Sequence, residues 1–303
     1  MTRDRRDHVL AGAVVVGYDG SEPATAAVEW AADEAATSGR GLAVLYAVDP
    51  AWFVPPVLAA EQWLSRDIVD VTQQVLSEGV IRAQKGHVGL DVQGLTVTDD
   101  ARNALVQASH VAAVVVVGNR GHGALAGAWL GSVSVAVTAH AHCPVVVVRG
   151  DGSVHPGPER SVVVGVDGSA GADAAVHFAA ERAAAARAPL EIVSVWQPGP
   201  NDARLWGLPA EHPVAMLRPF ADAAAGPLVH AAEQIVRQQQ PGVVVRSRVE
   251  VGPPGPALGA AAHDAGLLVV GSRGRGGFAG LLLGSVSRTA VHESVCPVAV
   301  VRS

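Results

Sequence analysis

The chain has 303 residues, of which 49% are apolar, 17% are charged and only 4% are aromatic, and its formal net charge is −6. This negative balance disfavours a broad nucleic-acid interface, and no apolar run in the sequence reaches the length needed to span a membrane. We expect a cytoplasmic protein, because the polar segment Met1–His8 is not followed by the apolar core of a signal peptide.

Short apolar segments alternate with helical segments along the first half of the chain. We expect strands at 13–18, 42–48, 90–98, 111–117 and 145–149, and helices at 23–37, 66–85, 100–110 and 132–140. Between them, the segment 49–64 carries prolines and tryptophans and is expected to be irregular.

The second half follows the same order. Strands are expected at 161–166, 190–196, 243–251, 267–270 and 298–302, with an irregular proline-bearing segment at 199–219 and a linker at 150–159. The sequence therefore predicts two domains, 1–150 and 151–303, each near typical domain size. Alternating strands and helices predict a mostly parallel, doubly wound sheet in each domain, which binds ligands beyond the carboxyl ends of its strands.

Matched motifs recur in the two halves. Each first strand ends in Asp-Gly-Ser, and each fourth strand leads into the pattern G-x2-G-x9-G-S, which occurs once per half and opens a helix. Such a loop can hold phosphate on its backbone N–H groups. Each half also has one cysteine before a proline and the last strand, which indicates a buried residue rather than a disulfide framework.

Two other phosphate loops fit less well. A Walker loop needs a lysine beside its second glycine, but the only lysine is Lys85. The letters of a dinucleotide fingerprint begin at Gly121 and at Gly274, yet that fingerprint belongs after the first strand of a domain and not after the fourth.

The pattern G-x2-G-x9-G-S resembles the ATP-binding signature of the universal stress protein family, and the Asp-Gly-Ser and Cys-Pro-Val motifs are similar as well. The resemblance covers nearly the whole chain as two tandem domains. It implies an α/β fold of two doubly wound, five-stranded, mostly parallel sheets, related to the adenine-nucleotide α-hydrolases. It also implies one adenine-nucleotide site per domain, which would take ATP with or without Mg²⁺.

The resemblance further implies a role for each site residue. Asp19 and Asp167 would hold the ribose or lie beside the adenine, and Ala47 and Val195 would contact the adenine. The remaining residues would surround the ribose and phosphates: Gly20, Ser21, Gly118, Gly121, Gly131, Ser132, Val133 and Ser134 in the first half, and Gly168, Ser169, Gly271, Gly274, Gly284, Ser285, Val286 and Ser287 in the second. Among these, Ser134 and Ser287 would add contacts through their hydroxyls. Independently of the resemblance, the charges of Arg120, Arg273 and Arg275 could offset phosphate charge.

The residues also leave alternatives open. The arginines could be solvated loop residues, and each aspartate could cap the helix that follows it. In the first half Asp99 and Asp100 follow the third strand and would add two carboxylates near the site, so we expect that site to be the weaker one.

Two functions remain in competition. We favour a nucleotide-dependent regulator in stress or dormancy, which acts on a protein partner of unknown identity, over a slow ATPase or an ATP-dependent transferase. We expect no catalytic base and no metal cluster. The closing strands of the two domains should pair, by resemblance to the family, to give an internal pseudo-dimer, and a homodimer is the other expected assembly.

Overall fold

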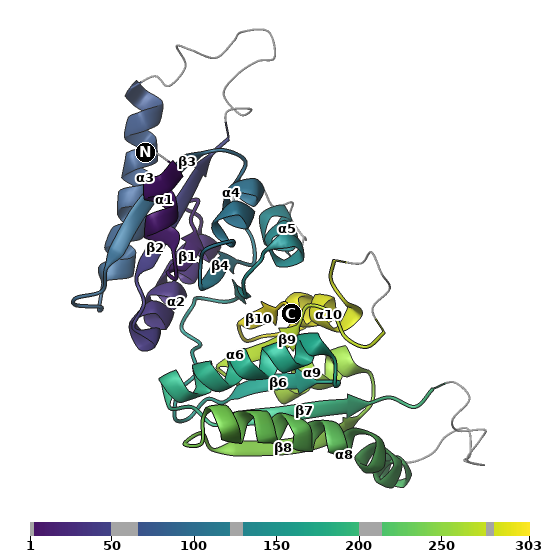
Figure 1. Cartoon of the computed structure of the whole chain (residues 1–303). Helices are drawn as coiled ribbons and strands as arrows, with labels where there is room; N and C mark the ends of the chain where they lie inside the picture. The colour runs from purple at the N-terminus through teal and green to yellow at the C-terminus, as the bar shows by residue number, and fades with distance from the viewer. Residues whose placement is uncertain (1–2, 50–65, 122–129, 200–213, 277–281) are drawn as a thin grey trace. The chain divides into compact units, whose positions relative to one another are not determined.

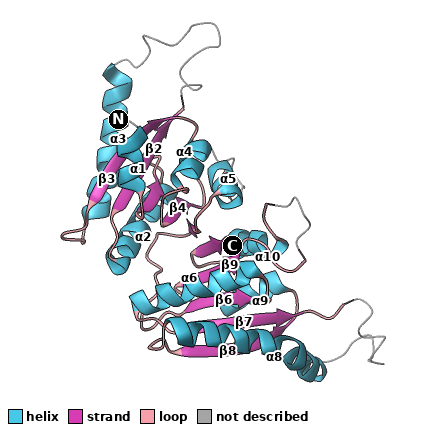
Figure 2. Cartoon of the chain, in the orientation of Figure 1, coloured by secondary structure: helices cyan, strands magenta, loops and turns pink. Residues whose placement is uncertain are grey.

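The computed structural model describes residues 3–49, 66–121, 130–199, 214–276 and 282–303. These residues form two compact units, Met1–Val154 and His155–Ser303. Each unit has a parallel sheet with helices on both faces (Figure 1, Figure 2). The doubly wound α/β fold expected from the sequence is therefore confirmed in both halves of the chain.

The sheet of the first unit reverses its order beside its first strand. Its strands run in the order β3-β2-β1-β4-β5, and all the pairs among them are parallel. Because β1 pairs with β2 on one side and with β4 on the other, the switch point lies between β1 and β4. The strands are β1 (Val14–Gly17), β2 (Leu42–Val48), β3 (Val92–Thr98), β4 (Val114–Gly118) and β5 (Val145–Val148).

Helices α2 and α3 cover one face of this sheet, and α4 and α5 cover the other. A Cβ atom on Gly17 would lie 2.9 Å from Leu105 of α4, and one on Gly79 of α3 would lie 2.7 Å from the ring of Tyr18, so both layers pack tightly. The helices are α1 (Arg3–Leu10), α2 (Glu22–Ser38), α3 (Arg66–Gln84), α4 (Ala101–Ala108) and α5 (Ser132–His140).

The second unit repeats the arrangement, with strand order β8-β7-β6-β9-β10 and parallel pairing. Helices α6 and α8 cover one face and α9 and α10 the other. The strands are β6 (Val162–Val166), β7 (Leu190–Trp196), β8 (Val245–Val251), β9 (Leu267–Gly271) and β10 (Val298–Val301), and the helices are α6 (Ala170–Ala186), α8 (Val214–Gln239), α9 (Pro254–Ala261) and α10 (Ser285–Glu293).

One expectation for the second unit is wrong. The segment 199–219 was expected to be irregular, but α8 begins at Val214 and contains both Pro219 and Pro227. A continuous stripe of buried side chains outweighs the two prolines: Leu217, Ala221, Ala225, Val229, Ala232 and Val236 recur every three or four residues and face the sheet. The rest of the segment, like 49–64 apart from Asp49, lies outside the described residues.

The residues that join the units are held by contacts within each unit. The indole nitrogen of Trp30 in α2 donates a hydrogen bond of 3.1 Å to the carbonyl oxygen of Val154. Gly152, with φ at +79°, lies so close to Ala26 of the same helix that it leaves no room for a Cβ atom. On the other side of the boundary, His155 and Pro156 lie equally close to Gly266, which precedes β9.

None of the helices in the described part of the chain is long and apolar enough to cross a membrane.

Candidate functional site

The Asp-Gly-Ser motif forms the same turn at the carboxyl end of the first strand in both units. In the first unit, Oδ1 of Asp19 accepts hydrogen bonds from the backbone N–H of Ser21 at 3.0 Å and from its hydroxyl at 2.6 Å. In the second unit, Asp167 makes the same two bonds to Ser169 at the same distances. The intervening glycines have φ values of +83° and +77°, a region that favours glycine.

The serine of each motif, and not the aspartate, caps the following helix. The hydroxyl oxygen of Ser21 accepts from the N–H of Ala24 at 3.3 Å, and that of Ser169 accepts from Ala172 at 3.2 Å. The interpretation of Asp19 and Asp167 as helix caps is therefore wrong. Each aspartate instead orients the capping serine through Oδ1, so its Oδ2 atom points elsewhere.

In both units Oδ2 meets the glycine loop that follows the fourth strand. A Cβ atom on Gly121 would overlap Oδ2 of Asp19, and one on Gly274 would overlap Oδ2 of Asp167. In the second unit this oxygen also accepts a hydrogen bond of 2.9 Å from the N–H of Arg275. The loop therefore closes directly onto the carboxylate, and glycine is required for that approach.

The first glycine of each signature lies against the start of the helix that follows the first strand. A Cβ atom on Gly118 would lie 2.5 Å from the carbonyl oxygen of Pro23, and one on Gly271 would lie 2.7 Å from the carbonyl carbon of Gly171. The signature glycines are thus used for close backbone approach, which brings the loop and the Asp-Gly-Ser turn together.

The third glycine of each signature begins a helix. The N–H of Gly131 donates to the carbonyl oxygen of Asn119 at 2.8 Å, and that of Gly284 donates to Ser272 at the same distance. Both glycines are N-cap residues, and in the described structure no side chain caps α5 or α10. The first-turn N–H groups therefore remain available to an anion. They belong to Ser132, Val133 and Ser134 in the first unit and to Ser285, Val286 and Ser287 in the second.

The hydroxyls of Ser134 and Ser287 bind the protein backbone. Ser134 is 3% exposed and donates to the carbonyl oxygen of Gly118 at 2.7 Å. Ser287 is 1% exposed and lies 3.0 Å from the carbonyl oxygens of both Ser272 and Gly284. The expectation that these hydroxyls contact a ligand is therefore wrong, because both are buried and bound to the loop backbone.

Ala47 lies near the end of β2 and Val195 near the end of β7, so each lies at the carboxyl edge of the sheet in its own unit. The residue before each of them is Tyr46 in the first unit and Ser194 in the second, and neither is among the site residues expected from the sequence. Burial raises the pKa of the Tyr46 phenol above its ordinary value, and the negative charge of Asp19 raises it further. The matched Ser194 instead donates its hydroxyl to the carbonyl oxygen of Val166 at 2.9 Å.

The arginines of the loops are exposed: Arg120 in the first unit and Arg273 and Arg275 in the second. Arg302, which follows β10 and is only partly exposed, is not among the site residues expected from the sequence. The sequence feature that could have identified it is its place at the end of the repeated segment that begins with Cys-Pro-Val, in which Arg149 is the matched residue of the first half.

The carboxylates of Asp99 and Asp100 accept hydrogen bonds from residues at the start of α4. Asp100 caps this helix by accepting from the N–H groups of Arg102 and Asn103. A hydrogen bond from the Arg102 guanidinium lowers the pKa of Asp100 below its ordinary value, although partial burial opposes the shift. Asp99 accepts from the Asn103 amide at 2.7 Å. In the described residues, no three His, Cys, Asp or Glu side chains gather as metal ligands.

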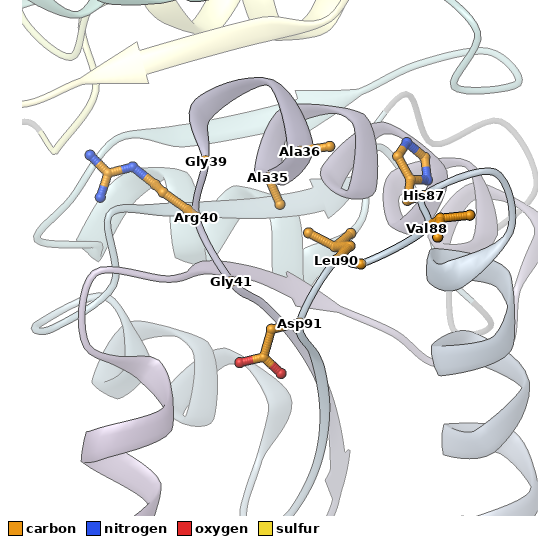
Figure 3. Close-up of a pocket in the computed structure, with 10 residues that line it drawn as sticks. Ala35, Ala36, Gly39, Arg40, Gly41, His87, Val88, Leu90 and Asp91 are labelled. Carbon is orange, nitrogen blue, oxygen red and sulfur yellow. The ribbon is translucent and has the colours of Figure 1, made fainter.

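A separate cavity lies at the opposite end of the first sheet, where the strands begin (Figure 3). It has a volume of about 390 Å³ and is lined by the end of α2 and the segment before β3. Nε2 of His87, one of its lining residues, lies 2.8 Å from Oδ1 of Asp33. Figure 3 shows the side chains of Arg40 and Asp91 directed away from His87, so the charged groups do not converge there.

Comparisons with known proteins place the chain in a family. A model of the Universal stress protein family matches residues 12–149 and again 159–302. A universal stress protein of Mycolicibacterium smegmatis is 34% identical over 299 residues, covering 95% of this chain and 96% of the relative. One of Mycobacterium tuberculosis is 35% identical over 305 residues, covering 95% and 94%.

A crystal structure of a universal stress protein from Archaeoglobus fulgidus shares the fold, with a TM-score of 0.66 at 22% identity over 96% of this chain and 98% of that one. The chain therefore belongs to the universal stress protein family and carries two tandem copies of the family domain.

Proposed function

We propose that each unit binds ATP at the carboxyl edge of its sheet and that nucleotide occupancy makes the protein a regulator in stress or dormancy. One observation carries the proposal. In both units the glycine loop closes onto the aspartate of the first strand so tightly that a Cβ atom would overlap Oδ2, while the helix after the loop begins without a side-chain cap. A carboxylate and a set of N–H donors thus lie side by side.

The two features match the two ends of a nucleotide. Asp19 and Asp167 would accept hydrogen bonds from the ribose hydroxyls, since a carboxylate oxygen with one donor has a further lone pair. The N–H groups at the starts of α5 and α10 would hold phosphate. The helix dipole contributes roughly 0.3–1 kcal/mol to such binding, and each hydrogen bond to a charged oxygen contributes on the order of 1.5–3 kcal/mol.

The nearby side chains would complete the site. Ala47 and Val195 at the ends of β2 and β7 would pack against the adenine, and Arg120, Arg273 and Arg275 would offset phosphate charge. Mg²⁺, if it enters, would come bound to the phosphates, because that ion is normally held by substrate phosphates with one or two carboxylates. These groups position and neutralise a nucleotide, so binding explains them without turnover.

Calorimetry with ATP tests the proposal on the full chain. We expect a stoichiometry near two for the unmodified protein and near one for Gly274→Ala, because the new Cβ atom overlaps Asp167. Gly276→Ala is the matched control in the same loop, since a Cβ atom there meets no described atom within 4 Å, and it should retain two sites. Failure of the unmodified protein to bind ATP, or an equal loss in both variants, would contradict the proposal.

A steady-state assay separates binding from enzymatic use of ATP. A regulator should hydrolyse ATP no faster than the double variant Gly121→Ala, Gly274→Ala. A rate well above that of the double variant would instead support the slow ATPase.

A further inference from the structure

Arg302 lies beside the glycine loop of the second unit because of the register of the last two strands. Val301 of β10 is paired with Gly271 of β9, and the N–H of Ser272 donates to the carbonyl oxygen of Val301 at 2.7 Å. The residue after Val301 therefore emerges next to the start of the loop, where Arg273 follows Ser272.

The guanidinium of Arg302 is held in a partly buried position. One of its nitrogens lies 3.5 Å from the carbonyl oxygen of Leu282, just before Gly284. Burial lowers the pKa of Arg302 below its ordinary value, and the positive charge of Arg273 lowers it further. Two like charges near each other are unfavourable unless an anion lies between or beside them.

One carboxylate lies at this loop, that of Asp167, and it accepts from the backbone N–H of Arg275. Its single negative charge is smaller than the combined positive charge of Arg273, Arg275 and Arg302. Among the described residues, no side-chain ion pair includes Arg273, Arg275 or Arg302. The uncapped start of α10 adds further positive potential at the same edge. The site therefore has a cationic surplus on three independent elements: the loop, the helix and the last strand.

The order of the strands shows where the positive charges lie relative to Asp167. Asp167 follows β6, the glycine loop follows β9 and Arg302 follows β10, and these three strands are neighbours in that order. Adjacent strands are about 4.8 Å apart, so Arg302 lies roughly 10 Å across the sheet from the strand that carries Asp167. A nucleotide with its ribose at Asp167 would place its first phosphate over the loop and any further phosphates toward β10.

We propose that Arg302, together with Arg273, is a specificity-determining pair that binds the terminal phosphates of the ligand and makes the second site selective for nucleoside triphosphates over monophosphates. This inference rests on the proposed function, since it assigns the far end of the same ligand. A planar guanidinium suits the role because it can donate two parallel hydrogen bonds to one phosphate.

The test uses the full chain with Gly121→Ala in the first unit, so that the second site is measured alone. Affinities for ATP, AMP and inorganic tripolyphosphate are compared before and after Arg302→Gln. We expect ATP and tripolyphosphate to bind about tenfold more weakly, the scale of one lost charged hydrogen bond, with AMP affinity unchanged. Arg302→Lys should recover part of the loss, because it retains the charge but not the paired donors.

Arg246→Gln is the matched control. This exposed arginine lies on β8, at the other edge of the same sheet, and its replacement makes the same change in net charge. It should leave all three affinities unchanged. Equal weakening of ATP and AMP by Arg302→Gln, or an equal effect of Arg246→Gln, would overturn the proposed pair.

The three probes distinguish this inference from the proposed function. If tripolyphosphate binds in an Arg302-dependent way but ATP does not bind, the phosphate site stands and the nucleotide function fails. If ATP binds and Arg302→Gln has no effect, the nucleotide function stands and the specificity pair fails. If none of the three probes binds, both fail.

Discussion

The backbone N–H of Arg275 donates a hydrogen bond of 2.9 Å to Oδ2 of Asp167. The other oxygen of this carboxylate accepts from both the N–H and the hydroxyl of Ser169. One side chain therefore joins the end of β6, the start of α6 and the glycine loop. Asp167 thus has a structural role that is independent of any ligand, and a variant must be measured for both stability and binding.

Asp167→Ala should weaken ATP at the second site by roughly 1.5–3 kcal/mol, which is about tenfold or more in dissociation constant. The physical reason is the loss of a charged acceptor for the ribose hydroxyls. Calorimetry measures the affinity, and a melting curve of the same variant measures the lost loop contacts. Competition by tripolyphosphate should change less than ATP affinity. A lowered melting temperature with normal ATP binding would remove Asp167 from the ribose site.

Ser287→Ala should lower stability by about 0.5–1.5 kcal/mol, the net contribution of one hydrogen bond, because the carbonyl oxygen of Ser272 loses its side-chain donor but keeps the N–H of Gly284. Ser285→Ala, two residues earlier on the same helix, is the matched control, since the side chain of Ser285 is exposed. Thermal unfolding of both variants checks the difference. Equal destabilisation by the two substitutions would show that the buried hydroxyl bond is not what stabilises the loop.

Arg187→Gly should stabilise the second unit by about 1–2 kcal/mol. Arg187 ends α6 with φ at +53° and is the only described residue other than glycine with a positive φ. The matched residue of the first unit is Gly39, which ends α2 with φ at +65°. Gly39→Arg should therefore destabilise the first unit by a similar amount. Chemical denaturation of the two variants tests this pair, and shifts of the same sign would contradict it.

Cys143 should react slowly with iodoacetamide in the folded protein at pH 8. Burial raises the pKa of its thiol from 9.0 to about 12, so the reactive thiolate is scarce there. Because the folded pKa is the higher one, this thiol's contribution to stability is fully present below pH 9 and is lost as the pH rises toward about 12. Labelling is measured in the Cys296→Ala background, with and without urea, and equal rates in both conditions would contradict the assignment.

Much of the fold could be predicted because the sequence marks it locally. The valine runs of β1, β4 and β5 are buried along their whole length except at Gly17, as expected for strands covered on both faces. Helix α1 was missed because its sequence is mostly polar, and among its residues 6–10, whose burial is described, only Leu10 is buried. The start of α8 was expected to be irregular because of its prolines, although the spacing of the apolar residues along this segment is that of an amphipathic helix.

The site was predictable where backbone geometry dictates residue type. The signature glycines lie close to the Asp-Gly-Ser turns, and close approach and positive φ at these positions permit few residues other than glycine. Side-chain direction was not predictable. The sequence could not show that the hydroxyls of Ser134 and Ser287 turn toward the backbone, nor that strand register brings Arg302 beside Arg273. Those facts depend on which strands become neighbours.

The hydrogen bond from Trp30 to Val154 has a practical meaning for anyone who wishes to divide or exchange the two halves. A first half cut after residue 150, the boundary that composition indicates, would lose Gly152 and Val154, which complete the surface of its own helix α2. A second half that begins after Pro156 would lose the residues packed on Gly266. Chimeras of related tandem proteins should therefore be joined at the single peptide bond between Val154 and His155, where each half keeps its own packing.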